Sequence, residues 1–239
     1  MKAKNKKKLF CCIKLKSMLS FCFACLLVAS ICFYSAKTEF VQMLPFVATI
    51  VIDPGHGGVD GGCVGKYTGV KESDLNLIYA KNLKQKLIDY GFRVVMTRNN
   101  REGLYDVDAT NLKKSDMKKR KQIIEESNAD IVISIHMNSY PAQSAKGSQV
   151  FFDKDSDSGN ILATSIQEQL KLNLKNTSKV AKIGDYYITS CTKVPSCLVE
   201  CGFVSNKEEE LLLQDREYQD KLCYAILCGV LMYYVGATS

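Results

Sequence analysis

Short apolar runs alternate with helical patterns along most of this chain. Several of the runs are rich in β-branched residues and end at proline, glycine or polar positions, as buried strands do. We expect strands at residues 48–53, 92–96, 130–135, 147–152 and 196–201, and a short one at 186–188.

Between these runs, apolar residues recur every three or four positions, as on the buried face of a helix. The clearest example spans residues 73–90, with Gly91 as its C-terminal stop. Ser115 would cap a basic helix, and Asn206 with Glu209 has the form of a capping box for another. The patterns predict further helices at residues 115–127, 161–173 and 217–234.

Strands that alternate with helices are typical of a mainly parallel sheet with both faces covered. We find neither an internal repeat nor a second domain in the sequence. The expected fold is therefore α/β: a single domain with a largely parallel sheet of about six strands, flanked by helices on both faces.

The first 47 residues have a different pattern. Residues 1–16 form a basic tail, residues 17–36 carry no charge, and residues 37–47 would connect them to a domain at 48–236. An apolar stretch of this length can cross a bilayer as a helix. A signal peptide has the same layout, but the absence of a clean A-x-A site favours an uncleaved anchor. The lysines would then stay in the cytosol, and the domain would lie outside the membrane.

Charge and glycine spacing exclude two classes of partner. The net charge is +7, and residues 1–16 contain seven lysines and no acid, which leaves 7 − 7 = 0 for the rest. A neutral domain is not expected to bind nucleic acid. The glycine-rich loop after His56 fits no nucleotide-phosphate motif, because Asp60 stands where G-x-G-x-x-G requires glycine.

The cysteines divide between the two parts of the chain. Five of the 11 lie in the first 47 residues and six in the domain. An oxidising exterior would make the latter candidates for disulfides. Four of them lie in apolar strand or helix patterns, which favours buried free thiols: Cys197, Cys201, Cys223 and Cys228.

The only two histidines of the chain occupy equivalent places. His56 and His136 each follow a predicted buried strand. The carboxyl ends of parallel strands meet at one crevice, where ligands bind. Each imidazole could instead be a hydrogen-bonded group at the edge of the core. Because both histidines have the same placement, we favour a shared metal site, for which zinc typically takes three protein ligands.

Three acidic residues are candidates for the remaining roles. Glu72 lies at the start of a predicted helix, and on spacing alone a favourable interaction with the helix N-terminus is the better explanation for it. Glu200 ends an apolar strand, where a buried carboxylate is costly unless it is paired or associated with a metal, and a salt bridge at the strand end is the alternative to a functional role. Asp53 could accept a hydrogen bond from a ligand imidazole or form an ordinary Asx turn.

Four segments of the chain resemble a known family. Residues 52–58, 72–77, 134–138 and 199–206 are similar, in this order, to motifs of the zinc-dependent N-acetylmuramoyl-L-alanine amidases, whose catalytic domain cleaves bacterial peptidoglycan. The resemblance covers about residues 48–235. It implies a largely parallel sheet flanked by helices, a Zn²⁺ ion bound by His56, Glu72 and His136, and a catalytic carboxylate at Glu200.

This chain is short, shows no wall-binding repeats and has one N-terminal hydrophobic segment, and in these features it resembles the CwlD-like amidases of sporulation and germination. This resemblance implies action on the spore cortex, on the path to muramic-δ-lactam, in the space between the forespore membranes. It also implies a possible lipoprotein partner. The expected reaction is hydrolysis of the amide between the lactyl group of N-acetylmuramic acid and L-alanine. Two alternatives stay open: a non-catalytic module that binds peptidoglycan or docks a partner, and a metal-dependent peptidoglycan deacetylase.

Overall fold

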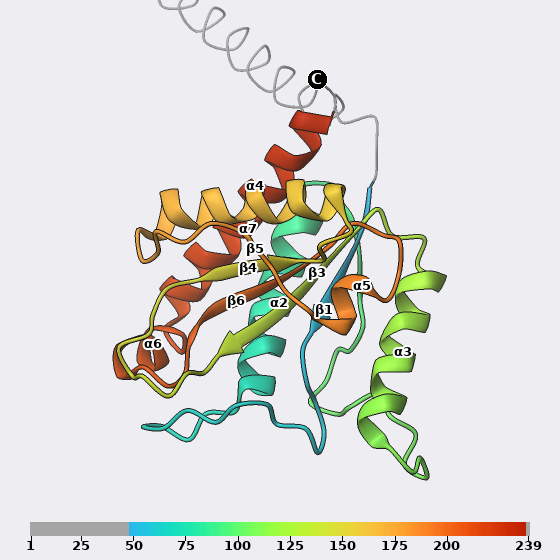
Figure 1. The fold of residues 1–239 in the computed structure, drawn as a ribbon, viewed down its shortest axis with the longest axis horizontal. Coiled ribbons are helices and arrows are strands. Elements are labelled where there is room, and N and C mark those ends of the chain that lie inside the picture. Colours follow the sequence, from blue (N-terminus) through green and yellow to red (C-terminus); the bar gives the residue numbers. More distant parts are fainter. Residues whose placement is uncertain (1–47, 238–239) are drawn as a thin grey trace, which may run out of the picture. The chain divides into compact units, whose positions relative to one another are not determined.

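A computed structural model describes residues 48–237, which contain one central sheet. Its six strands lie in the order β2-β1-β3-β6-β4-β5, and every neighbouring pair is parallel except β4 with β6 (Figure 1). The strands are β1 (Thr49–Pro54), β2 (Arg93–Met96), β3 (Ile131–Asn138), β4 (Gln149–Phe152), β5 (Lys182–Ile183) and β6 (Ser196–Phe203).

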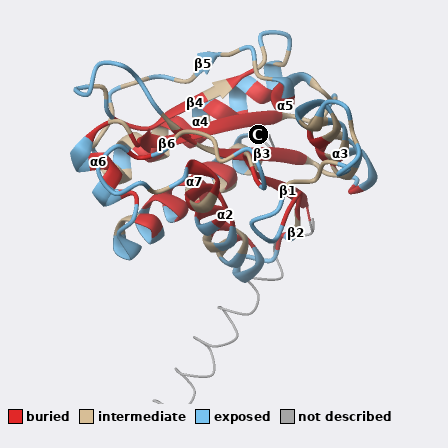
Figure 2. Ribbon diagram, turned by 90° about the horizontal axis from the view of Figure 1, so that it is seen from below, coloured by how far each residue is buried: buried red, intermediate tan, exposed pale blue. Residues whose placement is uncertain are grey.

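Helices cover both faces of this sheet. One face packs against α2 (Glu72–Asp89), α4 (Asp157–Leu174) and α7 (Arg216–Ala237), and the other against α3 (Leu112–Glu126) and α5 (Tyr187–Ser190). The short helix α6 (Lys207–Leu212) follows β6. Figure 2 shows the strands buried between these layers and the exposed residues on the outer sides of the helices. The predicted fold class is confirmed.

Alternate residues of the strands enter two different hydrophobic clusters. Ile50 and Ile52 of β1 belong to the larger cluster, which contains the apolar faces of α2, α4 and α7. Val51, between them, belongs to the smaller cluster with Ile124 of α3 and Ile188 of α5. This alternation is the two-residue period of a strand whose faces are both covered.

The chain changes direction across the sheet at β1. Strand β2 pairs with one side of β1 and β3 with the other, and the connecting helices α2 and α3 lie on opposite faces. Ligands of open α/β sheets bind at such a switch point, outside the carboxyl ends of the strands. His56 follows β1 and His136 lies in β3, so both histidines are delivered to this position.

Two strands continue beyond their predicted ends. Strand β3 runs through His136 to Asn138, and β6 runs to Phe203 instead of Cys201. The ladder between them continues from His136 and Glu200 to Asn138 and Phe203, with an irregularity in register between His136 and Asn138. His136 therefore lies within a strand and not after it, in register with Glu200.

The strand predicted at residues 186–188 is wrong. Tyr187–Ser190 form α5, in which the backbone N–H and the hydroxyl of Thr189 both donate to the Tyr186 carbonyl. Ile188 packs into the smaller cluster from this helix. The edge strand lies earlier in the chain, at β5, where it pairs with β4.

Two helices begin earlier than predicted. Asn111, not Ser115, caps α3 by accepting from the Lys114 N–H, and Ser115 lies inside the helix. Ser156 caps α4, which starts at Asp157 rather than near residue 161. The predicted cap at Asn206 is confirmed, since its side chain accepts from the backbone of Glu208 and Glu209.

The basic tail, the predicted anchor and the connector lie outside the described residues. Within residues 48–237, no helix combines the length and apolar character needed to cross a membrane. All six cysteines of this part are free, and the three that are fully buried are Cys197, Cys201 and Cys223.

One ion pair is completely removed from solvent. Arg120 of α3 contacts Asp53 at the end of β1, with 2.6 Å between Nη1 and Oδ1 and side-chain exposures of 0% and 2%. Asp116 forms a second ion pair with Arg120, and the hydroxyls of Thr97 and Ser134 donate to Asp53. Burial opposes ionisation, but Arg120 and these donors keep the pKa of Asp53 below its usual value.

We expect Asp53→Asn to lower the free energy of unfolding by about 3–5 kcal/mol, because it leaves a buried guanidinium without its main counter-ion. The matched control is Asp220→Asn, which removes the exposed partner of Lys86 and should cost less than about 1 kcal/mol. Urea unfolding at pH 7 measures both variants.

The difference in free energy of unfolding between the wild type and Asp53→Asn should depend on pH. Because the folded-state pKa of Asp53 is lowered, its stabilisation is fully present above the unfolded-state value of about 3.9 and is lost as the pH falls below it. The stability gap between wild type and Asp53→Asn should therefore narrow below about pH 4. A gap no larger than that of the control would contradict this role of the ion pair.

Candidate metal centre

His56 lies in an unusual backbone conformation just past β1. Its φ is 61°, a value that few residues other than glycine adopt. Two buried arginines hydrogen-bond the carbonyls of this turn. Arg120 donates to Pro54 and His56 at 2.8 and 2.6 Å, and Arg98 donates to Pro54 and Gly55 at 2.9 Å each. These bonds hold the turn, and with it the imidazole, in one position.

The ring of His56 lies between two carboxylates. Its Nε2 is 3.1 Å from Glu72 Oε1, and its Nδ1 is 2.9 Å from Asp60 Oδ2. The expectation that Asp53 orients a ligand imidazole is wrong, because Asp53 is fully engaged by Arg120, Thr97 and Ser134. Asp60, four residues after His56, is the carboxylate that forms an ion pair with this ring, without the geometry of a hydrogen bond to Nδ1.

Glu72 is the point at which the two histidines meet. It is the first residue of α2 and is 2% exposed. Its Oε1 lies 3.1 Å from His56 Nε2 and 2.9 Å from His136 Nδ1, and its Oε2 accepts from the Cys63 N–H at 2.8 Å. Burial raises the pKa of Glu72, but the two imidazoles outweigh this and hold it far below its usual value.

His136 packs directly against the turn before His56. A side chain at Gly55 would place its Cβ 2.1 Å from His136 Nε2, so only glycine fits there. The two imidazole rings are 4.9 Å apart between centroids and nearly perpendicular, at 74°. Sequence reasoning placed both rings at this edge, and the structure brings them into contact.

These three side chains fit a zinc ion. One ligand atom from each of His56, Glu72 and His136 lies within 4.8 Å of the others. The donors around tetrahedral zinc are separated by roughly 3.3 Å, since Zn–N and Zn–O bonds are about 2.0–2.2 Å long. The observed separations of 2.9 and 3.1 Å from Glu72 Oε1 are close to this value. Two imidazoles and one carboxylate also form a recurring donor set of catalytic zinc.

The surroundings of His56 favour its protonated form. Burial lowers its pKa, but the interactions with Glu72 and Asp60 outweigh it and raise the pKa to about 8. A metal ion bound to His56 would replace the proton on its ring. The carboxylates of Glu72 and Asp60, which attract this proton, would then attract the metal cation.

Glu200 faces the cluster from the neighbouring strand. It is in register with His136 of β3 and with Gln149 of β4, and it is 7% exposed. Its buried Oε2 has no hydrogen-bond partner among the described residues, and no ion pair involves it there. A salt-bridged structural glutamate is therefore not what the structure shows.

Burial is the main reason why the pKa of Glu200 is raised, to about 7. The histidines lower it, while the charge of Glu72 raises it further. A carboxyl group with this pKa can accept or donate a proton near neutral pH, as a general acid–base catalyst must.

Three residues around this centre were missed in the sequence. Arg120 lies in a basic run that is typical of a solvated helix face. The one feature of the sequence that suggests an ion pair for it is Asp116, four residues earlier. Arg98 directly follows β2 and carries no motif. Asp60 could have been found from its spacing of four residues from His56.

Comparisons with known proteins show what the chain is similar to. The model of the N-acetylmuramoyl-L-alanine amidase family matches residues 50–232. A germination-specific N-acetylmuramoyl-L-alanine amidase of Bacillus subtilis (strain 168) is 37% identical over 197 residues, which cover 80% of this chain and 82% of the relative.

Two solved structures are similar to the fold. The CwlD amidase from Clostridioides difficile, solved in complex with the GerS lipoprotein, matches with a TM-score of 0.76 at 35% identity, covering 79% of this chain and 98% of that one. An N-acetylmuramoyl-L-alanine amidase from Clostridium difficile 630 matches with a TM-score of 0.71 at 30% identity, with coverages of 79% and 97%.

The contact between Asp60 and His56 generates a prediction for metal binding. We expect Asp60→Asn to weaken Zn²⁺ binding about 10- to 100-fold, because His56 loses the carboxylate that orients its ring. Asp89→Asn, an exposed aspartate at the far end of α2, is the control and should leave the affinity unchanged. Competition with a chromogenic chelator measures both, and equal affinities in the two variants would show that Asp60 does not orient the ring.

Proposed function

The chain belongs to the N-acetylmuramoyl-L-alanine amidase family, and from this we propose that it is a zinc-dependent peptidoglycan amidase. The bond that it cleaves is the amide between the lactyl group of N-acetylmuramic acid and L-alanine. The observation that carries the proposal is the convergence of His56, Glu72 and His136 next to a buried carboxyl group without a partner, Glu200.

His56, Glu72 and His136 would be the ligands of the ion in this proposal. A zinc ion held there supplies Lewis-acid chemistry, since it lowers the pKa of water to about 7 and polarises a carbonyl group. Glu72 contributes a full negative charge, because the imidazoles keep it ionised. Asp60 orients His56, and Arg98 with Arg120 holds the turn that carries it.

Glu200 acts as the proton carrier in this mechanism. Its carboxylate accepts a proton from the attacking water and then delivers it to the nitrogen of the departing L-alanine. Because burial raises its pKa to about 7, neither protonation state is strongly disfavoured at neutral pH. Its open Oε2 provides a free acceptor for the first of these steps.

We place this activity in the spore cortex, on the way to muramic-δ-lactam and germination. The relative from Bacillus subtilis is named germination-specific, and the two chains cover four-fifths of each other. The enzyme would act on the extracytoplasmic face of the membrane, in the space around the forespore. Residues 17–36 would anchor or export it, and residues 48–236 would form the catalytic domain.

A lipoprotein is the partner that we propose. The support is the related CwlD amidase, whose structure was solved in complex with the GerS lipoprotein. Peptidoglycan of the cortex would be the substrate, and the membrane would be contacted through the N-terminal segment.

The assigned roles predict different losses for two variants. We expect Glu200→Gln to retain zinc but to lower kcat about 10²- to 10⁴-fold, since it cannot carry the proton. His56→Ala should lose both zinc and hydrolysis, because it removes a ligand. Metal analysis of the purified proteins and the rate of release of stem peptide measure the two effects. A fully active Glu200→Gln enzyme would contradict the role of this residue.

The identity of the cleaved bond has a direct test. Mass analysis of digested muropeptides should show free stem peptides and intact acetyl groups. Loss of acetyl mass would instead identify a deacetylase. Absence of any product, together with full biological function of His136→Ala, would identify a module that only binds peptidoglycan or a partner.

A further inference from the structure

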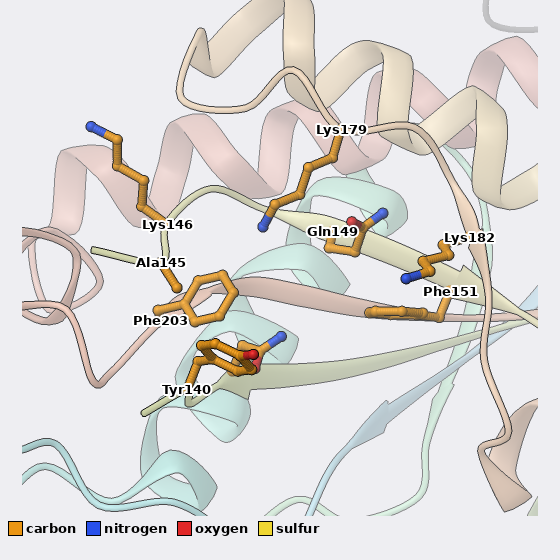
Figure 3. Close-up of a pocket in the computed structure, with 9 residues that line it drawn as sticks. Tyr140, Ala145, Lys146, Gln149, Phe151, Lys179, Lys182 and Phe203 are labelled. Atoms are coloured by element: carbon orange, nitrogen blue, oxygen red, sulfur yellow. The ribbon is translucent and has the colours of Figure 1, made fainter. Parts of the chain in front are cut away.

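A cavity of about 320 Å³ lies beside the candidate metal centre. Its lining includes residues at the ends of three strands: Asn138 of β3, Phe203 of β6 and Gln149 of β4. Figure 3 labels Phe203 and Gln149 among the residues around it. Gln149 is the direct partner of Glu200 across the β4–β6 pair, so the cavity begins one strand away from the catalytic carboxyl group.

The cavity is positively charged, although the domain as a whole is neutral. Among its described lining residues, three are lysines and none is acidic. In Figure 3, Lys179 points toward Phe203 and Lys182 toward Phe151, whereas Lys146 points away from the space between them. Two ammonium groups therefore approach the cavity from β5 and from the segment before it.

Both of these ammonium groups have capacity left for a ligand. Lys179 donates one hydrogen bond to the Gly147 carbonyl at 2.8 Å and lies 4.6 Å from the centre of the Phe203 ring. An ammonium group has three donors, so two remain. No ion pair within the described residues involves Lys179 or Lys182. Glu209 and Glu200 attract Lys179 without a direct ion pair, and Lys182 is exposed. Both ammonium groups therefore remain available to a ligand above an aromatic floor.

On the basis of the proposed function, we propose that this cavity binds the peptide stem of the substrate, with Lys179 and Lys182 contacting its carboxylates. The stem starts at the L-alanine nitrogen and carries free carboxylates on its glutamyl residue and at its C-terminus.

The dimensions of the sheet suit such a peptide. Strand β5 lies two strands from β6, which is roughly 10 Å at about 4.8 Å per strand. An extended peptide covers about 3.3–3.6 Å per residue, so about three residues of the stem reach from Glu200 to Lys182. The uncleaved glycan strand is a poorer match for this cavity, because its lactyl carboxyl groups are blocked by the amide to L-alanine.

The test compares two muropeptides, one with free stem carboxylates and one with these carboxylates amidated. We expect the kcat/KM of the wild type to be higher on the free form, and we expect Lys179→Gln/Lys182→Gln to lose this preference. Each lysine should contribute about fivefold to the ratio of the two kcat/KM values, which corresponds to the upper end for a solvent-exposed ion pair. Lys182→Gln alone, which leaves the contact with Gly147 intact, should lose about half of the preference on a logarithmic scale.

The control variant is Lys81→Gln/Lys221→Gln, which removes two exposed lysines from α2 and α7 and should keep the wild-type preference. Equal kcat/KM of the wild type on both muropeptides, or the same loss in the control, would overturn the proposal.

A binding measurement separates this proposal from the proposed reaction. Calorimetry with the free tetrapeptide stem should show binding to the wild type that weakens with salt and is reduced in Lys182→Gln. Failure to hydrolyse either muropeptide would refute the amidase activity, while the calorimetric result would still decide the use of the cavity. If inorganic phosphate competed as well as the peptide, the cavity would be an unspecific anion site and the proposal would be wrong.

Discussion

The arrangement of the metal centre depends on the ion pair between Arg120 and Asp53, which lies in the interior of the domain. A buried guanidinium is costly unless all of its donors are used, and here two carboxylates and two backbone carbonyls accept from it. Because those carbonyls belong to the turn before and at His56, the bonds that satisfy Arg120 also determine where the imidazole lies. Stability and preorganisation of the centre therefore have the same physical origin.

Two glutamates at one edge of the sheet have opposite electrostatic environments. Glu72 of α2 lies between two imidazoles and stays ionised. Glu200 is buried on β6 without a hydrogen-bond partner in the part of the chain that the structure describes, and this burial raises its pKa to about 7. Groups whose pKa values are pushed apart in this way are suited to different tasks, one to bind a cation and one to transfer a proton. The division follows from position alone, since the two side chains are chemically identical.

The neutral net charge of the domain conceals a local asymmetry. Acidic groups gather around the two histidines, while the adjoining cavity contains three lysines and no acidic residue among its described lining. A cation and an anionic peptide would thus be attracted to neighbouring parts of the same sheet edge. His136 of β3 and Glu200 of β6 belong to the first part, and the cavity is lined from β3, β6 and the neighbouring β4, so the sheet sets the distance between them.

Much of this protein could be predicted from its sequence, because buried strands have local signatures. The β-branched runs at β1, β3 and β6 established the fold class and brought His56, His136 and Glu200 to one edge of the sheet, although β3 and β6 continue past His136 and Glu200. Glu72 was different: its position at a helix start has an ordinary explanation, and only packing shows its Oε1 within 3.1 Å of both imidazoles. Arg120 reads locally as a solvated residue, yet it contacts an aspartate 67 positions away. The lysine cavity likewise joins segments that are far apart in the chain. Such contacts depend on how helices and strands pack, which no local pattern records.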